Sequence, residues 1–444
     1  MFKKILIANR GEIAVRIIRS CKELGIETVA VYSQVDSEAL HVRLADEAYC
    51  IGPANPQQSY LQEERVLATA EIAGAEAIHP GYGFLSERES FASLCRRHDK
   101  VFIGPEAETM DLMGDKSKAR SIMAEAGVPV VPGSSGSLEQ PEEAEAVAEE
   151  IGYPLLIKAS HGGGGRGMRV VHHREQLLDL ISTARSESRA AFGSDHVYLE
   201  KYLEEPRHIE FQVLGDASGR VVELGERDCS LQRRHQKVLE EAPSTALDPQ
   251  LRDEMGEMAL RVARRAEYTG AGTVEFLLDA RGNFYFIEMN TRIQVEHPVT
   301  EMRTGLDLIA EQIKIAAGEE ISDPEGIEHR GAVIECRINA EDPDRNFTPS
   351  PGTIEELQLP GGMGVRIDSA LYPGMEVSAA YDSLLAKLIC WGRDRQEAIN
   401  RTSRALDEFH IKGIKTNIDL HRRILNNAFF RRGEIYTNFI QRRL

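Results

Sequence analysis

Two carboxylates in the segment "GTVEFLLDARGNFYFIEMN" (272–290) have the spacing of a metal site. Two strand-like runs flank the turn Ala280–Asn283, and pairing these two residues puts Glu275 directly opposite Glu288. Like charges opposed in a mostly apolar hairpin repel each other unless a cation lies between them. Asn290 faces the same way as Glu288, because alternate residues of a strand share a face. Two carboxylates and an amide oxygen suit Mg²⁺ or Mn²⁺ that shares its ligand shell with phosphates.

A stripe of polar residues continues beyond this hairpin, with apolar residues between its members. We expect the strand to run on until Pro298 ends it. A half-buried strand with a solvated outer face would show the same alternation. The mixture of amide, guanidinium and carboxyl groups beside a carboxylate pair favours a binding site instead. The stripe consists of Glu288, Asn290, Arg292, Gln294 and Glu296.

The stretch "KASHGGGGRGM" (158–168) contains four consecutive glycines. A phosphate-binding loop of the Walker type is excluded, because Met168 and Arg169 follow Gly167 where Lys and Ser or Thr are required. The run "MRVV" predicts a strand, so the unit is a hairpin whose glycine N–H groups can approach phosphate oxygens. Lys158 could place its ammonium on the same phosphates. A surface hairpin without a ligand is the alternative, and this stretch alone does not decide between them.

Strand and helix patterns alternate over the first hundred residues, which predicts a doubly wound parallel sheet of Rossmann-like type. Asp36 follows the second strand, where a ribose-binding acid could lie. The turn "ANRGEIA" has one glycine where a dinucleotide fingerprint needs three, so we do not expect a dinucleotide site. Residues 130–203 are typical of a small α+β subdomain. The remainder is rich in strand patterns and has a helical C-terminal third.

Length and charge bound the class of protein. A chain of 444 residues should form about two or three domains. The net charge of -18 argues against nucleic acid or an anionic membrane as the main partner. Six cysteines without a CxxC pair, no signal peptide and no long apolar run lead us to expect a cytoplasmic protein. Cys229 is expected to be a small buried residue rather than a nucleophile.

Taken together, several segments resemble biotin carboxylase, a member of the ATP-grasp superfamily. They are "IANRGEIAVRIIR", "AIHPGYGFLSE", "GDK", "IKASHGGGGRGM", "ERDCSLQRRHQK", "FIEMNTRIQVEHPVTE", "ECRINAEDP" and "GIKTN". The resemblance implies a Rossmann-like domain (1–114), a linker helix and mobile lid subdomain with the glycine loop (115–203), an ATP-grasp core (204–330) and a C-terminal α+β domain (331–444).

The resemblance also implies the site residues. Those that would bind ATP are Lys116, Lys158, Gly163, Gly164, Gly165, Glu200, Lys201, Leu203, His208, Gln232, His235, Glu275 and Glu288. Those that would hold the metal are Glu275, Glu288 and Asn290. Those that would bind bicarbonate are Lys237, Arg292, Gln294, Val295 and Glu296, and those that would bind biotin are Tyr82 and Arg337.

In the implied reaction, the catalytic residues are Glu296, Arg292, Lys237 and Arg337. Glu296 is the general base that deprotonates bicarbonate, which then attacks the γ-phosphate of ATP to give carboxyphosphate and ADP. Arg337 stabilises the enolate-like form of biotin that accepts CO₂. His161 departs from the small residue usual at the start of the family's glycine loop, and we expect altered lid dynamics rather than lost function.

The biotin attachment sequence Met-Lys-Met does not occur in the chain. We therefore expect similarity to the stand-alone subunit of bacterial acetyl-CoA carboxylase, with biotin on a separate carrier protein and a separate carboxyltransferase as partners. The resemblance implies a homodimer with Arg16 and Arg19 at its interface. A carboxylase component for another acyl-CoA or pyruvate fits equally well. A non-catalytic ATP-binding regulator is disfavoured, because Glu296, Lys237 and Arg337 are all present.

Overall fold

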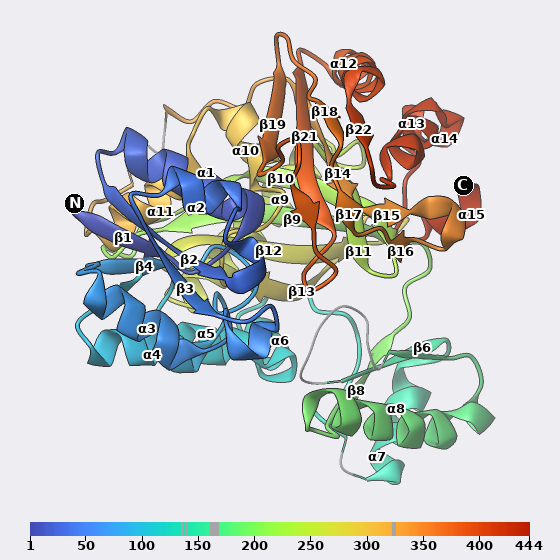
Figure 1. The fold of residues 1–444 in the computed structure, drawn as a ribbon. Helices are drawn as coiled ribbons and strands as arrows, with labels where there is room; N and C mark the ends of the chain where they lie inside the picture. Colours follow the sequence, from blue (N-terminus) through green and yellow to red (C-terminus); the bar gives the residue numbers. More distant parts are fainter. Residues whose placement is uncertain (135, 139, 160–167, 322–325) are drawn as a thin grey trace.

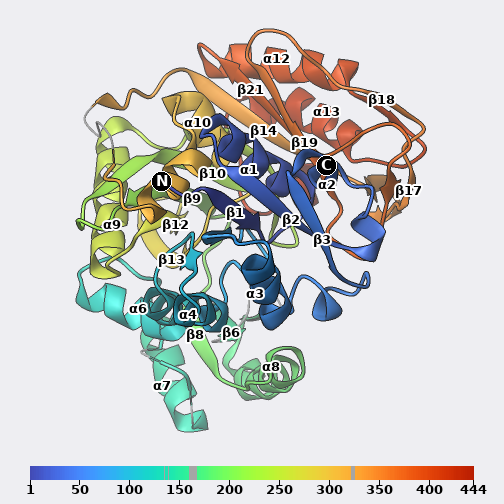
Figure 2. The same cartoon turned by 60° about the vertical axis from the view of Figure 1, so that its left-hand side comes forward.

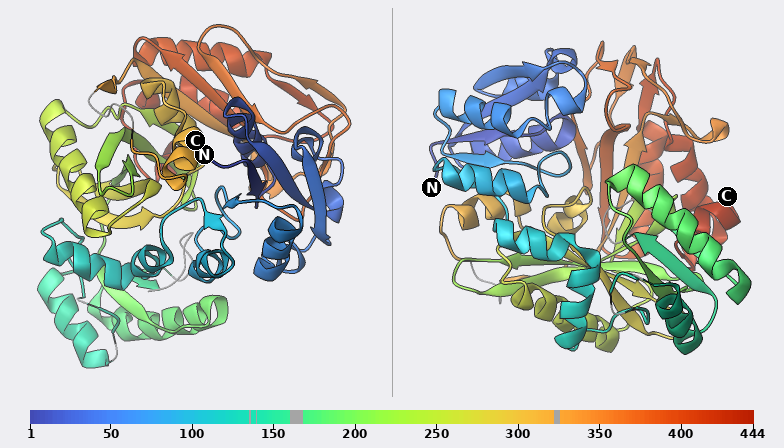
Figure 3. Two further views of the ribbon diagram at one scale, coloured as in Figure 1. Left: turned by 90° about the vertical axis from the view of Figure 1, so that its left-hand side faces the viewer. Right: turned by 90° about the horizontal axis from the view of Figure 1, so that it is seen from below.

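The computed structural model describes residues 1–134, 136–138, 140–159, 168–321 and 326–444, and Figure 1 shows its fold. The N-terminal part (blue) and the C-terminal part (red) belong to one body, whereas the segment around α8 projects away from it. The left-hand view of Figure 3 shows the same projection from another side. Among the described helices, none is both long and apolar enough to cross a membrane.

The first hundred residues form a parallel sheet, as predicted, and its strand order is β3-β2-β1-β4-β5. Its central strand β1 is apolar on both faces because helices cover both sides. Ile5 and Ile7 pack with α1, whereas Leu6 packs with α3 and α4. The elements are β1 Lys4–Ile7, α1 Gly11–Glu23, β2 Glu27–Ser33, α2 Leu40–Leu44, β3 Glu47–Gly52, α3 Glu63–Ile72, β4 Ala77–His79, α4 Glu89–Arg97, β5 Val101–Phe102 and α5 Ala107–Gly114.

Asp36 occupies the position of a ribose-binding acid, but the protein's own side chains take its oxygens. The Arg10 guanidinium lies 2.7 Å from its Oδ1, and the Tyr60 hydroxyl donates to its Oδ2 at 2.6 Å. The ring of Tyr381, from the C-terminal part of the chain, lies 4.2 Å from the Arg10 guanidinium. These contacts join the N-terminal sheet to the C-terminal part of the chain.

The projecting segment is a three-stranded sheet in the order β7-β6-β8, with α7 and α8 packed on it. The predicted hairpin is confirmed: β6 and β7 are antiparallel and flank the glycine stretch. Ala144 and Ala148, one turn apart on α7, pack against Leu155 and Leu199 of the sheet. The elements are α7 Pro141–Ile151, β6 Leu155–Ala159, β7 Arg169–Val171, α8 Leu177–Phe192 and β8 Val197–Lys201. Helix α6 Lys116–Glu125 precedes them in the chain and packs against α5 instead.

An eight-stranded antiparallel sheet, in the order β13-β12-β9-β10-β11-β14-β21-β19, forms the centre of the molecule. Strands from before and after residue 330, where we expected one domain to end, belong to this one sheet. Its strands and adjoining helices up to that point are β9 Arg207–Gly215, β10 Val221–Arg233, β11 Gln236–Ala242, α9 Pro249–Arg265, β12 Gly270–Leu278, β13 Phe284–Asn290, α10 His297–Thr304 and α11 Leu308–Ala316.

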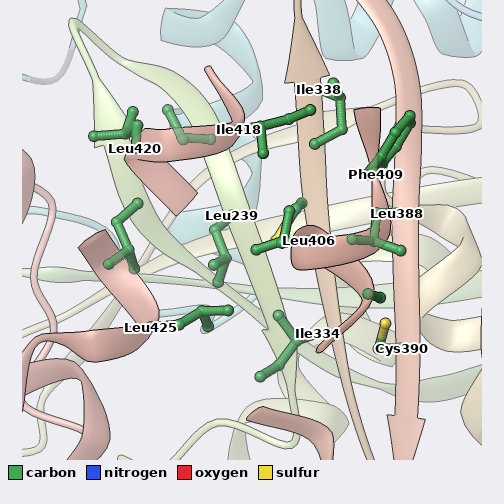
Figure 4. Packing of buried hydrophobic residues seen from close by; sticks show 14 of the residues in the cluster. Leu239, Ile334, Ile338, Leu388, Cys390, Leu406, Phe409, Ile418, Leu420 and Leu425 are labelled. Carbon is green, nitrogen blue, oxygen red and sulfur yellow. The ribbon is translucent and has the colours of Figure 1, made fainter. Parts of the chain in front are cut away.

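The sequence pattern predicts a helical C-terminal third, and this prediction is wrong, because the segment contains both strands and helices. Three of its strands complete the central sheet, and α12 and α13 bury Leu406 and Leu425 against Leu239 and Leu388 (Figure 4). The strands are β14 Ala332–Asn339, β15 Glu341–Asp342, β16 Thr348–Pro349, β17 Gly352–Thr353, β18 Glu356–Gln358, β19 Val365–Ser369, β20 Glu376–Val377, β21 Leu384–Gly392 and β22 His410–Lys412. The helices are α12 Arg395–Glu408, α13 Ile418–Asn426, α14 Ala428–Arg431 and α15 Phe439–Arg443.

Candidate active site

Glu275 of β12 lies directly opposite Glu288 of β13, as the sequence predicted. The register at the turn differs from the prediction, because Asp279 rather than Ala280 bonds to Asn283 (N to O, 2.8 Å). Phe276 then pairs with Phe286, and Ile287 is an extra residue without a partner. This bulge restores the predicted register at the two carboxylates.

Four charged residues form one row across the central sheet. Glu288, Glu275, Glu210 and Arg227 are successive partners on β13, β12, β9 and β10. Direct partners on antiparallel strands point to the same face, so this row lines one side of the sheet. Three acids in a row require cations from elsewhere, because only one arginine lies among them.

Lys237 and His208 supply positive charge beside Glu275. Lys237 Nζ lies 3.0 Å from Glu275 Oε1 and 2.5 Å from Glu210 Oε2. His208 Nε2 lies 3.0 Å from Glu275 Oε2. Burial alone would raise the pKa of Glu275, but Lys237 and His208 hold it well below its usual range. Asn290 and Gln294 donate amide hydrogen bonds to Glu275 Oε1 at 2.9 and 2.8 Å.

Glu288 is neutralised by a second lysine, which comes from α6, the helix that packs against β13. Lys116, the first residue of α6, places its Nζ 2.5 Å from Glu288 Oε2. Carboxylate and amide oxygens are the donors that Mg²⁺ and Mn²⁺ prefer, and Glu275, Glu288 and Asn290 supply them on one face of the hairpin. The residues present therefore fit a hard divalent cation. When no cation is bound, Lys116 and Lys237 balance the negative charge of Glu288 and Glu275.

Glu296 lies at the centre of a buried cluster of charges. Its Oε1 is 2.6 Å from Lys237 Nζ, and its Oε2 is 2.8 Å from Arg337 Nη2. Burial alone would raise the pKa of Glu296, but Lys237 and Arg337 hold it far below its usual range, so the carboxylate is ionised. Arg337 also donates through Nε to Glu240 at 2.6 Å, and burial raises the pKa of Glu240 to about 7.

The polar stripe does not continue as a strand to Glu296. Strand β13 ends at Asn290, residues 291–296 form an irregular turn, and α10 begins at His297 with Pro298 in its first turn. Proline suits that position because the first helical N–H groups have no intrahelical partner. The prediction that Pro298 ends a strand is therefore wrong, although Gln294 and Glu296 do reach the same cluster as Glu275.

The expected nucleotide-binding residues lie in two groups. In the projecting sheet, Lys158 Nζ is 2.5 Å from Glu200 Oε2, and Arg120 of α6 is 3.8 Å from Glu200 Oε1. The Lys201 side chain turns away from this group and donates to the carbonyl oxygens of Gly152 and Tyr153 at 2.9 and 3.0 Å. Only the backbone of Lys201 can therefore serve the expected role.

The second group lies on the central sheet. His208 Nδ1 and Gln232 Nε2 are 2.8 Å apart. The other ring nitrogen of His208, Nε2, lies 3.0 Å from Glu275 Oε2, so this pair adjoins the carboxylate. His235 lies in the exposed turn between β10 and β11, and Leu203 is half-buried in the segment after β8. Gly163, Gly164, Gly165 and His161 lie outside the described residues.

Arg292 and Tyr82 each contact a carboxylate from the N-terminal part of the chain. Arg292 donates to Asn290 Oδ1 at 3.2 Å and to Glu87 Oε2 at 3.0 Å. The Tyr82 hydroxyl donates to Glu12 of α1. Cys229 is buried, its Sγ lies 4.0 Å from Glu296 Oε1, and burial raises its pKa well above the usual range, which disfavours a nucleophilic thiolate.

Sequence reasoning missed several charged residues that hold this site. Arg227 is fully buried and donates to Glu210 at 2.6 Å and to Gln294 Oε1 at 3.0 Å. Lys387 donates to the Val295 carbonyl at 2.9 Å. For Lys387 the available signal was a lone charge inside the otherwise apolar strand "LLAKLIC", because a buried charge requires a partner. Arg227 lies in the polar stretch "GERDCS" and gave no such signal.

The fold and the site define an ATP-grasp ligase: a small α+β lid with a lysine hairpin faces an antiparallel sheet that carries paired acids. A family model described as "Carbamoyl-phosphate synthase L chain, ATP binding domain" matches residues 115–323. The models described as "Biotin carboxylase, N-terminal domain" and "Biotin carboxylase C-terminal domain" match residues 1–110 and 335–442.

Comparison with known proteins shows which ATP-grasp ligases the chain resembles in sequence and structure. Biotin carboxylase 1 of Bacillus subtilis (strain 168) is 56% identical over 443 residues, which cover 99% of this chain and 98% of the relative. A pyruvate carboxylase subunit of Methanothermobacter thermautotrophicus is 54% identical over 441 residues, or 99% of this chain and 90% of the relative. A crystal structure of the biotin carboxylase domain dimer of Hydrogenobacter thermophilus 2-oxoglutarate carboxylase, in complex with MgADP, ADP and bicarbonate, matches with a TM-score of 0.96 and 53% identity. It covers 99% of this chain and 97% of the other.

The chain belongs to the biotin carboxylase family. It is an ATP-dependent ligase that carboxylates biotin.

Proposed function

We propose that Glu296 is the general base of this reaction and that bicarbonate binds beside it, between Lys237 and Arg292. The observation that carries the proposal is the position of the Glu296 carboxylate, which is ionised, buried and held by both Lys237 and Arg337. A base that removes a proton from bicarbonate has to be ionised and lie within hydrogen-bond distance of its substrate. Val295 and Gln294 complete the proposed anion site through the turn before α10.

An anion bound by Lys237 also explains how so acidic a carboxylate can act as a base. Without substrate, Lys237 stabilises the ionised form of Glu296 and makes it a weak base. An anion that accepts hydrogen bonds from Lys237 competes with Glu296 for the same ammonium. The pKa of Glu296 then rises towards neutrality, where a general base is most effective.

The nucleotide is proposed to lie between the lid and the central sheet. Lys158 on β6 and Lys116 on α6 are the cations for its phosphates, and both now neutralise carboxylates that a phosphate would replace as partners. Glu275, Glu288 and Asn290 would hold Mg²⁺ or Mn²⁺, which when bound neutralises charge on the phosphates. His208, Gln232 and His235, with Glu200 and the backbones of Lys201 and Leu203, are proposed to contact the rest of the nucleotide.

Biotin is proposed to lie on the other side of Glu296. Arg337 is proposed to stabilise the enolate-like oxygen of the ureido group, and its hydrogen bonds to Glu240 and Glu296, which hold two edges of its guanidinium, support this role. Tyr82 is proposed to lie beside the biotin ring. Carboxyphosphate breaks down to CO₂ and phosphate, and the phosphate takes the ureido proton before the nitrogen attacks CO₂.

We further propose that the final product is malonyl-CoA, through acetyl-CoA carboxylase, with biotin on a separate carrier protein and a separate carboxyltransferase. A second candidate is a pyruvate or 2-oxoglutarate carboxylase, which the names of two relatives favour. The chain is proposed to act as a homodimer. Arg19 is exposed and free for such an interface, whereas Arg16 is committed within the chain to Glu301 and Asp307, at 2.9 and 2.7 Å.

The test is ADP release by the purified chain with MgATP, with and without bicarbonate and with and without free biotin. We expect release that requires bicarbonate and increases with biotin. Bicarbonate-independent release, or none with wild-type protein that binds ATP, would contradict the proposed site. Purified carrier proteins from acetyl-CoA, pyruvate and 2-oxoglutarate carboxylases, offered in turn as substrates, would distinguish the candidate pathways.

A further inference from the structure

Lys387 is a fully buried lysine that the proposed reaction does not use. It lies within β21, has no exposed surface, and is surrounded by the apolar strand "LLAKLICWG". A buried ammonium is destabilising unless acids and hydrogen-bond acceptors compensate it. Its carboxylate partners are Glu12 Oε2 at 3.2 Å and Asp368 Oδ2 at 3.8 Å. Its hydrogen bond, however, goes to the carbonyl oxygen of Val295 at 2.9 Å.

That hydrogen bond fixes the backbone of the proposed base. The N–H and C=O of a trans peptide point in opposite directions, so holding the Val295 carbonyl towards β21 directs the Glu296 N–H away from it. One residue earlier, the ring Nδ1 of buried His297 lies 2.8 Å from the Gln294 carbonyl oxygen. Burial holds the pKa of His297 well below its usual range, so the ring is neutral and Nδ1–H is the donor. Two buried side chains thus hold two successive carbonyls of the proposed anion-binding turn.

Glu12, one of the two carboxylate partners of Lys387, also contacts Tyr82 of the proposed biotin subsite. Glu12 contacts Lys387 through Oε2, and through Oε1 it accepts a hydrogen bond from the Tyr82 hydroxyl. Helix α1, which carries Glu12, lies beside β19 and β21, as Figure 2 shows. The Tyr82 loop is itself fixed, because Asn9 Nδ2 donates to the carbonyl oxygens of Pro80 and Tyr82 at 2.7 Å each. Tyr82, Glu12, Lys387 and Val295 therefore form one continuous chain of polar contacts.

We propose that Lys387 is a positioning residue that couples the anion-binding turn to the Tyr82 loop, so that each proposed subsite binds its ligand more tightly when the other is occupied. The proposal rests on the function proposed above, which assigns bicarbonate to the turn and biotin to Tyr82. Lys387 contacts neither ligand in that assignment. Its effect is to hold both contact surfaces in one arrangement, and coupling of this kind acts equally in both directions.

The first test is Lys387→Met, which keeps the aliphatic stem and removes the ammonium. We expect the KM for bicarbonate to rise about tenfold, because the turn is no longer held, while the KM for ATP changes less than about twofold. Arg395→Met is the matched control. Arg395 also neutralises a buried acid, Glu241, at 2.7 Å, but it does not touch the turn or the Tyr82 loop. It should lower the unfolding midpoint and leave the KM for bicarbonate unchanged.

The second test remains informative if Lys387→Met fails to fold. Tyr82→Phe removes one hydroxyl, and bicarbonate-dependent ADP release can be measured without any biotin, so that a direct biotin contact has no influence. We expect the KM for bicarbonate in this biotin-free assay to rise about two- to threefold in Tyr82→Phe. Combining it with Glu12→Gln should give little further change, because both variants interrupt the same chain of contacts.

Unchanged KM values for bicarbonate in both Lys387→Met and biotin-free Tyr82→Phe would overturn the coupling and reduce Lys387 to a structural role. Additive effects of Tyr82→Phe and Glu12→Gln would also contradict it. Failure of the proposed function is a separate outcome, because it would appear as absent bicarbonate-dependent ADP release in the wild-type protein.

Discussion

The Lys237 ammonium lies 2.6 Å from the Oε1 of Glu296, and the same ammonium reaches Glu275 at 3.0 Å. One cation therefore joins the proposed base to the proposed metal-binding acids. Substrate anions and the metal both alter the charge that Lys237 meets, so their effects on Glu296 cannot be independent. Substitutions on either side of Lys237 separate the two roles.

Glu296→Gln should lower bicarbonate-dependent ADP release by at least about 100-fold, because removal of a general base typically costs that much. The amide still accepts a hydrogen bond from Arg337, and the nucleotide contacts proposed above lie elsewhere. ADP binding, measured by calorimetry, should therefore change less than about threefold. Turnover close to that of the wild type would refute the assignment of the base.

Glu288→Gln should weaken the dependence on metal more than the binding of nucleotide. The concentration of Mg²⁺ that gives half-maximal ADP release should rise about tenfold, since one of the proposed hard ligands loses its charge. ADP binding in the presence of a chelator should change little, and Glu254→Gln on the exposed side of α9 serves as control. Equal losses with and without metal would argue against Glu288 as a ligand.

The hairpin β12–β13 shows what the sequence could predict. Local alternation and a short turn were enough to oppose Glu275 and Glu288, since both signals come from neighbouring residues. The bulge at Ile287 was not visible, because which residue a strand leaves unpaired depends on packing against β9 and α6 rather than on local pattern. The two departures from the predicted register cancel at the carboxylates.

The turn 291–296 and Lys387 show where sequence reasoning failed. Alternating polar residues were interpreted as a strand, although Pro298 equally marks the first turn of a helix. The partners of Lys387 come from α1, β19 and the turn, which are far apart in the sequence. A single buried charge indicates that partners exist, but only the three-dimensional arrangement identifies them.

Glu240→Gln should impair the biotin-dependent part of the reaction selectively. Glu240 is fully buried and holds Arg337 Nε at 2.6 Å, so a neutral amide leaves the guanidinium less firmly oriented. We expect biotin stimulation of ADP release to fall about tenfold, while bicarbonate-dependent release without biotin changes less than about threefold.

The adjacent residue provides a matched control for that prediction. Glu241 is equally buried but pairs with Arg395, remote from Arg337. Glu241→Gln should lower stability without altering biotin stimulation. If both variants reduce biotin stimulation to the same degree, the effect of Glu240 is general destabilisation rather than orientation of Arg337.

Asp368 predicts a pH dependence of stability. Burial alone would raise its pKa, but Arg366 at 2.7 Å and Lys387 at 3.8 Å lower it to about 2. A carboxylate whose folded pKa lies below its unfolded value stabilises the fold above about pH 4 and loses that contribution as the pH falls towards its folded pKa. Asp368→Asn should therefore lower the free energy of unfolding by about 2 kcal/mol at pH 7, and the difference from wild type should shrink below about pH 4. Urea titrations at several pH values measure it, with Asp419→Asn on the exposed face of α13 as a control expected to cost under about 0.5 kcal/mol. A difference that is the same at pH 3 as at pH 7 would show that Asp368 acts through packing rather than through its charge.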